Sequence, residues 1–506
     1  MWIKFAMALI PIIWLIISLG VMRIPAARAC IVGLVLTILL AIFSFKLSVP
    51  NTLTAALEGI IMGIWPIMFV IVAALFAYNV TTESGGMKTI QDMLATISTD
   101  KRIIVLIIAW GFGGFLESIA GFGTAVAISA GILISFGLEP IQASVISLIA
   151  NTTATAYGAI GLPILTLGEV TNLNQVSLSF LVSLQLCILV VLVPFILVIL
   201  TGGGLKVIKG VGFITLMSGL GMAIPQVIAA RFVGAELPAI AGSICSTAVT
   251  IWLTKWHKDE KEPEVERPDN KTLLKACSTF ILIFIFVILA SSLVPPVNNL
   301  LNKVTTNLVV YTGKNPNTLS ISWLSSPGTL ILIATLIGGT IQGVSFKRMM
   351  QILGKSIKAV GMTTVTVCAI VGLAKVMVYA GMTDALAVAL VSLLGPVYPL
   401  FAPLIGALGT FLTGSATSAN VLFGNLQLSA ATDLGVNKYW VVASNMTGAT
   451  AGMLSPQNIA VATGAIHREG DEGEILKETV KWGSLYLVVC CVFLYIMGLL
   501  TGMIQS

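Results

Sequence analysis

Long apolar runs separated by short polar loops dominate this chain of 506 residues. The hydrocarbon core of a bilayer needs about 20 apolar residues for each spanning helix, and many stretches of the sequence approach that length. The runs that fit a span are residues 5–22, 27–45, 57–80, 179–201, 208–230, 233–254, 273–294, 327–343, 356–380 and 480–503. The pattern therefore predicts an all-α polytopic membrane protein.

Composition excludes the main soluble classes. Apolar residues make up 57% of the chain and charged residues only 9%, whereas soluble domains carry roughly 25% charged residues. A soluble enzyme, a disordered chain and a nucleic-acid binder are therefore excluded. The net charge of +6 comes from short basic clusters between apolar runs, which is the distribution that membrane topology requires.

Few residues are available for metal, cofactor or catalytic chemistry. The seven cysteines form no CxxC pair, and the two histidines, His257 and His467, lie at predicted membrane edges. We therefore expect no disulfide framework, no metal site and no cofactor. No GxxxxGK[ST] motif is present, so transport driven by ATP hydrolysis in this chain is not expected. Since no nucleophile–base constellation is readable, a membrane enzyme is the remotest of the alternatives.

The basic clusters also predict an orientation. Cytoplasmic loops are enriched in Lys and Arg, and the loops near 46–56, 171–178 and 295–326 are poor in both. We expect the N-terminus outside and a retained first helix, because no small-x-small cleavage site directly follows the run 5–22. The clusters assigned to the cytoplasm are Arg23/Arg28, Lys101/Arg102, Lys206/Lys209, the 255–271 loop and Lys347/Arg348/Lys355/Lys358.

The most polar segment, 255–271, carries five basic and six acidic residues. We interpret it as a solvated linker between two halves of the protein. The domain boundaries that follow are 1–56 for N-terminal helices outside the repeat, 57–254 for the first repeat and following helices, 255–272 for the cytoplasmic linker, 273–355 for linking helices, and 356–506 for the second repeat and C-terminal helix.

Three short patterns recur at nearly one offset, which indicates an internal repeat. Gly86-Met87 recurs at 381–382, the pattern at 113–117 recurs at 409–413, and Asn151-Thr152-Thr153 recurs as 445–447. The charges of the flanking loops are opposite for the two copies, so we expect an inverted repeat. Secondary transporters use inverted repeats with the ligand near the midplane, which predicts roughly 12–16 spanning or half-spanning helices with re-entrant hairpins or interrupted helices.

The first candidate interruption, 110–129, holds five glycines within 13 residues. That density disfavours a continuous helix, and bare backbone at membrane depth is tolerated where it lines a cavity. A helix starting near Thr124 would direct its N-terminal amides at an anion. The alternative is close helix packing through small residues. The substrate-binding candidates here are Ser118, Gly121, Phe122, Gly123 and Thr124.

The second candidate interruption, 409–428, carries seven hydroxyl or amide side chains within residues 413–427 and no charge. Neutral donors on a broken helix suit a carboxylate and a hydroxyl group. The same side chains can instead cap helices or join them. The substrate-binding candidates here are Ser415, Thr417, Ser418 and Asn420.

A further pair of polar segments, with Pro163 and Pro456 as helix breakers, is expected to complete the cavity. The first segment offers Asn151, Thr152, Thr153 and Tyr157, and the second offers Asn445, Ser455 and Gln457.

Glu117 is the candidate for proton coupling. It lies inside the glycine-rich segment, whereas Glu139 and Glu169 are interpreted as loop residues. Low dielectric disfavours the charged form of a carboxylate, so a buried acid takes up a proton near neutral pH, and intramembrane acids often form proton relays. The alternative is a structural acid in a water-filled vestibule. For Lys375 the choices are holding a carboxylate or snorkelling to the surface, and we favour snorkelling.

Several motifs resemble the L-lactate permease family: FLESIAGFGTAVAI (115–128), NTTATAYGAIGLP (151–163), FVGAELP (232–238), TGSATSANVLFGNLQ (413–427) and SPQNIAVA (455–462). The resemblance extends over nearly the whole chain. It places the family's motif acid on Glu117, its Asn-Thr motif on 151–152 and its Ser-Pro-Gln motif on 455–457. Many members have Gly at Ser118, Pro at Ala125 and an acid at Ala416, and a Lys often precedes Ser-Pro-Gln where Leu454 stands here. These departures leave the substrate range open.

The resemblance implies a multi-pass permease of the bacterial plasma membrane that couples L-lactate and related 2-hydroxymonocarboxylates to proton uptake. Protonation of Glu117 would remove the charge that repels the anion, and the substrate hydroxyl would meet Asn151 or Asn420. The alternatives are a symporter of another organic anion, including a Na⁺-coupled one, and a passive anion channel or facilitator. The sequence leaves the oligomeric state open.

Overall fold

The computed structural model describes the chain except residues 1, 16, 19–21, 23, 96, 120, 122–123, 257–267, 291–292, 314–315, 317, 467, 469–470 and 505–506. The described residues form helices, connecting loops and one small hairpin of two antiparallel strands. The all-α membrane architecture predicted from the sequence is confirmed.

The first half of the chain is helical throughout. Its helices are α1 (Trp2–Leu15), α2 (Ala26–Phe43), α3 (Val49–Met62), α4 (Phe69–Glu83), α5 (Gly86–Ala95), α6 (Lys101–Val105), α7 (Gly113–Ile119), α8 (Thr124–Ser135), α9 (Pro140–Ala154), α10 (Gly158–Thr171), α11 (Gln175–Gly202), α12 (Gly212–Phe232) and α13 (Pro238–Thr254). Short helical turns η2 (Gly63–Met68), η3 (Leu106–Phe112), η4 (Thr155–Tyr157) and η5 (Leu205–Ile208) connect some of them.

The second half adds the strands. Its elements are α14 (Asn270–Ala290), α15 (Pro295–Leu301), β1 (Thr305–Leu308), β2 (Leu319–Ser322), α16 (Pro327–Ile341), α17 (Phe346–Ala359), α18 (Gly361–Tyr379), α19 (Met382–Leu394), α20 (Tyr398–Thr413), α21 (Ala416–Leu434), α22 (Lys438–Ala449), α23 (Pro456–Ala465) and α24 (Glu472–Leu500), with the turns η6 (Gly395–Val397) and η7 (Gly452–Leu454). Thr305 pairs with Ser322 and Leu308 with Leu319.

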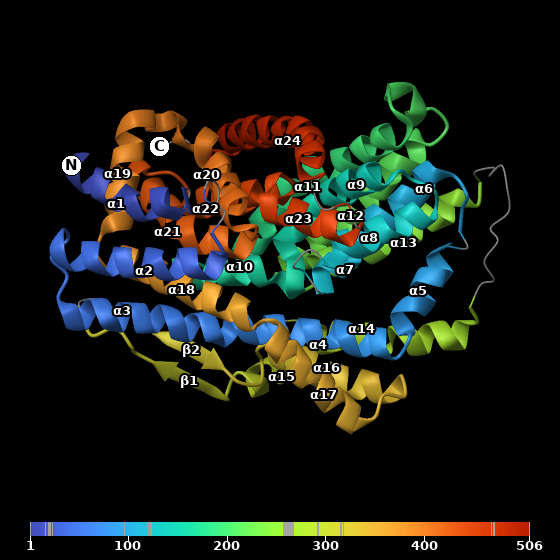
Figure 1. Ribbon diagram of the computed structural model, residues 1–506, viewed down its shortest axis with the longest axis horizontal. Coiled ribbons are helices and arrows are strands. Elements are labelled where there is room, and N and C mark those ends of the chain that lie inside the picture. Colours follow the sequence, from blue (N-terminus) through green and yellow to red (C-terminus); the bar gives the residue numbers. More distant parts are fainter. Residues whose placement is uncertain are drawn as a thin grey trace.

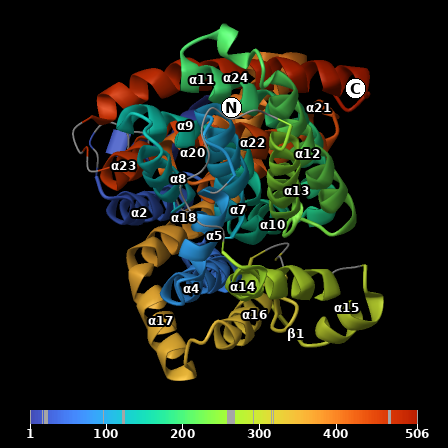
Figure 2. The same ribbon diagram turned by 90° about the vertical axis from the view of Figure 1, so that its right-hand side faces the viewer.

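The helices form two layers. Figures 1 and 2 show α4 and α14–α17, together with the hairpin, along one side of the larger group that contains α7–α13 and α20–α24. Helix α18 packs against α2, α3 and α21, and thereby connects the two layers. The end of α13, the start of α14 and α6 lie toward one end of the long axis in Figure 1, while α3 begins at the other end. The direction of the chain across the bilayer stays a prediction.

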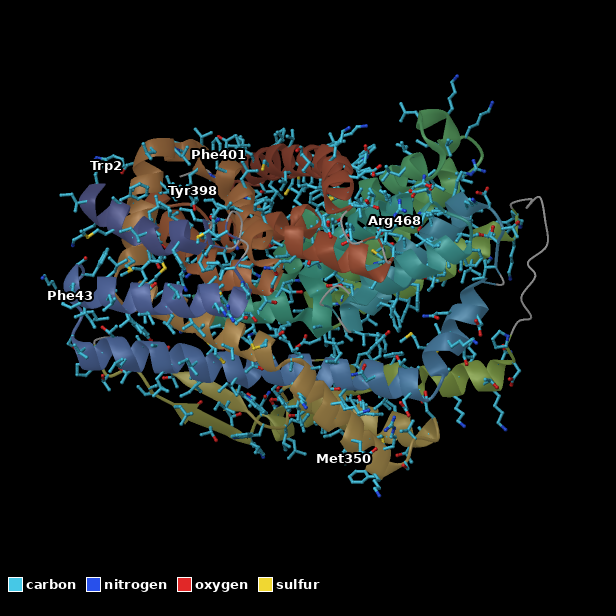
Figure 3. All side chains as sticks on the ribbon, in the orientation of Figure 1. Trp2, Phe43, Met350, Tyr398, Phe401 and Arg468 are labelled. Carbon is cyan, nitrogen blue, oxygen red and sulfur yellow. The ribbon has the colours of Figure 1, made fainter. Side chains whose placement is uncertain are left out.

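Nine helical stretches in the described ranges are long and apolar enough to cross a membrane. Their outward faces are rich in Leu, Ile, Val and Phe, which suits contact with lipid. Trp2 and Phe43 are exposed, and Figure 3 shows both at the same end of the long axis. The longest stretch, Val49–Glu83, contains a kink at Trp65, because the following Pro66 disfavours helical backbone at the residue before it.

One predicted span and one predicted loop differ from the structure. Of the first span, 5–22, helix α1 covers the part up to Leu15, and much of the rest lies outside the described residues. The span predicted at 356–380 begins only at Gly361, since the preceding segment forms the separate amphipathic helix α17. The external loop predicted at 295–326 contains α15 and the hairpin. The lengths of the loops and the positions of their basic residues did not indicate α15, α17 or the hairpin.

Lys375 does not snorkel, and here the sequence-based interpretation was wrong. Its Nζ lies 2.9 Å from Oε1 of Glu58, and the two side chains are only 8% and 2% exposed. The hydroxyl of Tyr379 donates to both oxygens of Glu58, at 2.9 and 3.0 Å. A buried charge requires a partner charge and further hydrogen bonds, and the sequence gives no signal for a partner 317 positions away.

Four helix breaks gather the polar segments. One lies between α7 and α8 and another between α20 and α21, and each contains a glycine with positive φ, Gly121 or Gly414. The turn η4 separates α9 from α10, and η7 separates α22 from α23. The start of a new helix at Thr124 is confirmed. The same order of breaks occurs in both halves, whereas the inversion of the repeat and the domain boundaries stay predictions.

Candidate functional site

A small cavity lies where the four helix breaks meet. Its volume is about 70 Å³, room for a ligand of a few heavy atoms, since a single water needs about 10–15 Å³ on this kind of measure. Its walls come from both halves of the chain. The lining residues are Glu117, Gly121, Val126, Leu148, Asn151, Thr152, Thr155, Gly158, Ala159, Leu162, Pro163, Gly414, Ser415, Ala416, Thr417, Gly452, Met453 and Asn458.

Glu117 is the only ionisable side chain among the described lining residues. It is 4% exposed, and its Oε2 has no hydrogen-bond partner in the part of the chain that the structure describes. The side chain of Asn151 lies beside this carboxyl group, and Oδ1 of Asn151 also has no partner among the described residues. Unsatisfied buried acceptors are costly, so a proton, water or a ligand hydroxyl would complete the bonds that the described residues of this wall leave open.

The segment that follows Gly158 has an uncommon backbone. Ala159, Ile160 and Gly161 all have positive φ, of 45°, 58° and 77°. A β-branched residue in this region is rare, and such strain persists where the surroundings impose it. Gly158 precedes this turn, and a Cβ built on it would lie 2.8 Å from Oε1 of Glu117. The missing side chain at Gly158 therefore makes room for the carboxyl group.

The second half contributes the start of α21. Ser415 caps this helix by accepting a hydrogen bond from the backbone N–H of Ser418 at 3.2 Å. Ser415, Ala416 and Thr417 all line the cavity. The first amides of a helix lack intrahelical acceptors and carry a partial positive charge. An anion in the cavity would therefore have the α21 terminus on one side and Glu117 on the other.

The structure places six of the predicted site residues on the cavity wall: Glu117, Gly121, Asn151, Thr152, Ser415 and Thr417. Phe122 and Gly123 lie outside the described residues, and of Thr124 only the backbone is described, as the first residue of α8.

Five other predicted residues do not line the cavity. The hydroxyl of Ser118 donates to the Gly114 carbonyl at 2.6 Å, and that of Tyr157 donates to the Ser179 carbonyl at 2.8 Å. Thr153, Ser418 and Ser455 are buried away from the cavity wall.

Asn420 and Asn445 form a buried network behind the wall. Nδ2 of Asn420 donates to the carbonyl of Pro163 at 2.9 Å, and its Oδ1 accepts from Nδ2 of Asn445 at 3.0 Å. Oδ1 of Asn445 accepts from Gln427, which in turn accepts from the hydroxyl of Tyr398. This chain of bonds anchors α10 to α21 and α22. Gln457 packs against Gly414 and does not line the cavity.

Sequence reasoning missed three wall residues with chemistry or shape: Thr155, Gly158 and Asn458. Thr155 lies one helical turn after Asn151, and its hydroxyl donates to the Asn151 carbonyl at 2.7 Å. Asn458 follows the Ser-Pro-Gln motif directly, and its Nδ2 donates to the carbonyl of Gly452 at 2.8 Å. Thr155 and Asn458 could therefore have been predicted from their spacing to residues that the sequence had already singled out.

Glu169 also differs from its prediction, because it lies inside α10 and not in a loop. Glu139 does precede a helix, as the N-cap of α9. No group of three His, Cys, Asp or Glu side chains suited to a metal ion comes together in the described ranges.

Comparison with known proteins decides the family. The sequence model of the L-lactate permease family matches residues 4–501 of this chain. The chain belongs to the L-lactate permease family. It is 54% identical to an L-lactate permease of Streptococcus iniae, with 86% of this chain and 93% of that protein covered. It is 33% identical to the glycolate permease GlcA of Escherichia coli, with 99% and 96% covered, and 31% identical to an L-lactate permease of Bacillus subtilis, with 97% and 95% covered.

The fold of the permease also resembles a solved transporter. Neisseria gonorrhoeae MtrF, described as illuminating a class of antimetabolite efflux pumps, superposes with a TM-score of 0.50 at 13% sequence identity, covering 88% of this chain and 83% of that one. The likeness concerns the fold alone. Family membership and the apolar helices make the permease a multi-pass protein of the bacterial plasma membrane, and a transporter by family.

Proposed function

We propose that this permease moves L-lactate, glycolate or a similar short 2-hydroxymonocarboxylate across the membrane together with a proton carried by Glu117. The observation that carries the proposal is a carboxyl oxygen of Glu117 that has no partner among the described residues and lies in a small cavity between interrupted helices. The names of the lactate and glycolate permeases to which the chain is similar support the substrate class.

The cavity offers complementary groups for such a substrate. The carboxylate would lie at the start of α21, near Ser415 and Thr417, where helix amides favour an anion. The 2-hydroxyl group would donate to the free Oδ1 of Asn151. Asn420, the other candidate from the sequence, has its amide engaged behind the wall, so Asn151 takes this role in the proposal.

Charge repulsion gives the physical reason for coupling. Two like charges about 5 Å apart repel by about 3 kcal/mol at an effective dielectric of about 20, which corresponds to roughly a hundredfold in affinity. An anionic substrate beside ionised Glu117 would meet this penalty, and a proton on Glu117 removes it. Binding of the anion and protonation of the carboxyl group therefore favour each other.

The test is uptake of radiolabelled L-lactate and glycolate into proteoliposomes with an inward proton gradient, with and without a protonophore. We expect accumulation above equilibrium that the protonophore abolishes. In Glu117→Gln, which is neutral at every pH, the gradient should no longer drive accumulation. The matched control is Glu474→Gln, which changes an exposed acid in the first turn of α24.

Three outcomes would overturn the proposal. Full proton-driven accumulation by Glu117→Gln would remove the role of this residue. Uptake by the unmodified protein that only equilibrates would indicate a facilitator or channel, and uptake that follows a Na⁺ gradient alone would indicate a different coupling ion.

A further inference from the structure

A second, larger cavity of about 340 Å³ lies between the two layers of helices. Its walls come from α10, the start of α11, the loop between α12 and α13, and α14–α16 with β2. In Figure 2 these elements of the smaller layer lie against the side of the larger layer that contains α10 and α13. Two of the segments that line it, 171–178 and 295–326, are ones that the sequence assigns to the external side. We call this space the vestibule.

The chemistry of the vestibule suits a cation. Glu169 and Glu236 are the only ionisable side chains among its described lining residues. Two further wall residues, Thr166 and Ser326, are 1% and 5% exposed, and their hydroxyl oxygens have no hydrogen-bond partner in the described part of the chain. Buried hydroxyl groups without partners require water or an ion to complete their bonds. Oε1 of Glu169 accepts a hydrogen bond from Gln175 at 3.1 Å.

The vestibule adjoins the substrate cavity. Leu162 lines both spaces. Leu162, Thr166 and Glu169 are spaced i, i+4 and i+7 on α10, so they share one helix face. About 10 Å of helix separates the first residue from the last, at 1.5 Å per residue. The same face therefore carries an acid at its vestibule end and, at its other end, Leu162, which also lines the substrate cavity that contains Glu117.

The charges around the vestibule acids are few. Lys375 on α18 acts on Glu169 electrostatically, but it is paired with Glu58 of α3. Arg231, at the end of α12, lies over the ring of Phe180 at 5.0 Å. Burial raises the pKa of Glu236, which lies between the spanning segments, so this group retains a proton at a higher pH than an ordinary glutamate.

We propose that Glu169 and Glu236 make the vestibule the route by which external protons reach Glu117, separate from the anion contacts of the substrate cavity. The proposal rests on the proton coupling proposed above. Two carboxylates would repel the substrate anion, whereas they attract protons and raise the local supply. Thr166, between Glu169 and Leu162, provides a hydroxyl that both donates and accepts.

The step is a proton transfer. The O–H bond of a vestibule carboxyl group breaks, leaving a carboxylate, and a water or the Thr166 hydroxyl passes on a proton. An O–H bond then forms on Glu117. The vestibule carboxylate regains its proton from external water, so charge is conserved and no further reactant is required.

The experiment uses proteoliposomes that contain a pH-sensitive dye, with lactate added outside at neutral pH. We measure lactate-driven acidification and, separately, exchange of labelled for unlabelled lactate at equal pH, which requires no net proton movement. For Glu169→Gln combined with Glu236→Gln, we expect acidification about a hundredfold slower than in the unmodified protein, as for loss of a proton-transfer group, with exchange retained. Glu474→Gln serves as the control with an unchanged rate.

A second variant tests the barrier. Leu162→Ala should allow protons to enter without lactate, since it removes the side chain shared by the two spaces. Loss of exchange together with acidification in the double variant would assign the two acids to folding or substrate binding and overturn the proposal. So would unchanged acidification in a protein whose unmodified form is proton-coupled. If the unmodified form shows no lactate-driven acidification, the proton coupling itself fails.

Discussion

Two buried glutamates of this permease have opposite surroundings. Glu58, where α3 meets α18, has the ammonium group of Lys375 at 2.9 Å and the hydroxyl of Tyr379 donating to both oxygens. Glu117, where α7 meets α10, has no charged neighbour on its cavity wall and one oxygen without a partner among the described residues. Both are less than 5% exposed.

The difference separates a structural role from a chemical one. A buried carboxylate that has a cationic partner and further hydrogen bonds is held in one arrangement by these bonds. A buried carboxyl group with an open oxygen beside a cavity can change its protonation and its partner. Burial and residue type are the same in both cases, so the partners decide the role.

The largest effect on stability should come from breaking the ion pair between Lys375 and Glu58. Lys375→Met leaves the Glu58 charge buried and unpaired, which costs about 3–5 kcal/mol, and we expect a strong loss of thermal stability in detergent. Adding Glu58→Leu should restore most of it, since apolar residues replace a buried pair with little loss. Equal stability of the single variant and the unmodified protein would show that the pair is not compensated as described.

Gly158→Ala tests the space around the carboxyl group of Glu117. The added Cβ would lie 2.8 Å from Oε1 of Glu117, and overpacking costs about 1–3 kcal/mol. We expect initial lactate uptake to fall about tenfold or more with a small change in thermal stability. Gly131→Ala is the matched control, because a Cβ at this glycine has no neighbour within 4 Å. Normal uptake by Gly158→Ala would show that the space around the carboxyl group of Glu117 is not needed for transport.

Asn420→Ala should weaken the buried hydrogen-bond network behind the cavity wall. It leaves buried partners at Pro163 and Asn445 unsatisfied, at a cost of about 1–3 kcal/mol. We expect lower thermal stability and an unchanged KM for lactate in the folded fraction. Thr366→Ala, which removes an exposed hydroxyl bonded within its own helix, is the control. A raised KM with unchanged stability would return Asn420 to the binding site.

Thr417→Val removes one hydroxyl from the cavity wall and keeps the shape of the side chain. Loss of one hydrogen bond of about 0.5–1.5 kcal/mol should raise the KM for lactate about two- to tenfold. Ser429→Ala, on the exposed face of the same helix, should leave it unchanged. An unaltered KM in Thr417→Val would confine the role of α21 to its backbone amides.

The smallest effect is expected at an exposed pair. Nε of Arg348 lies 2.9 Å from Oε1 of Glu83, and both side chains are about 40% exposed. Solvent-exposed pairs contribute little, so Arg348→Ala should leave the melting temperature within experimental error. A marked fall would show that the contact between α17 and α4 depends on this pair.

The sequence predicted the parts of the fold that depend on local pattern. Runs of apolar residues gave the spanning helices, and glycine density gave the break before Thr124. The buried ion pair was not predictable, because it joins Glu58 to a lysine on a distant helix. For the same reason α17 and the hairpin, which depend on packing against their neighbours, were missed.

The candidate site shows the same division. Glu117 stood out as a charge in an apolar, glycine-rich segment, and it does lie in the cavity. Asn420 and Asn445 have the same residue type as Asn151, yet they bond to each other behind the wall. Sequence alone does not reveal which amides have partners, and that distinction decides which side chains remain available to a ligand.

Under the proposed proton coupling, Glu117 as the one ionisable group among the described lining residues has a bioenergetic consequence. An empty carrier with ionised Glu117 holds one negative charge in the cavity, and a loaded carrier with one proton and one monocarboxylate also holds one. Each uncompensated charge moved across the membrane exchanges about 2.3 kcal/mol per 100 mV with the electric field. Because the charge of the two forms is the same, transport should be electroneutral, and the pH difference alone should set how far the substrate is concentrated.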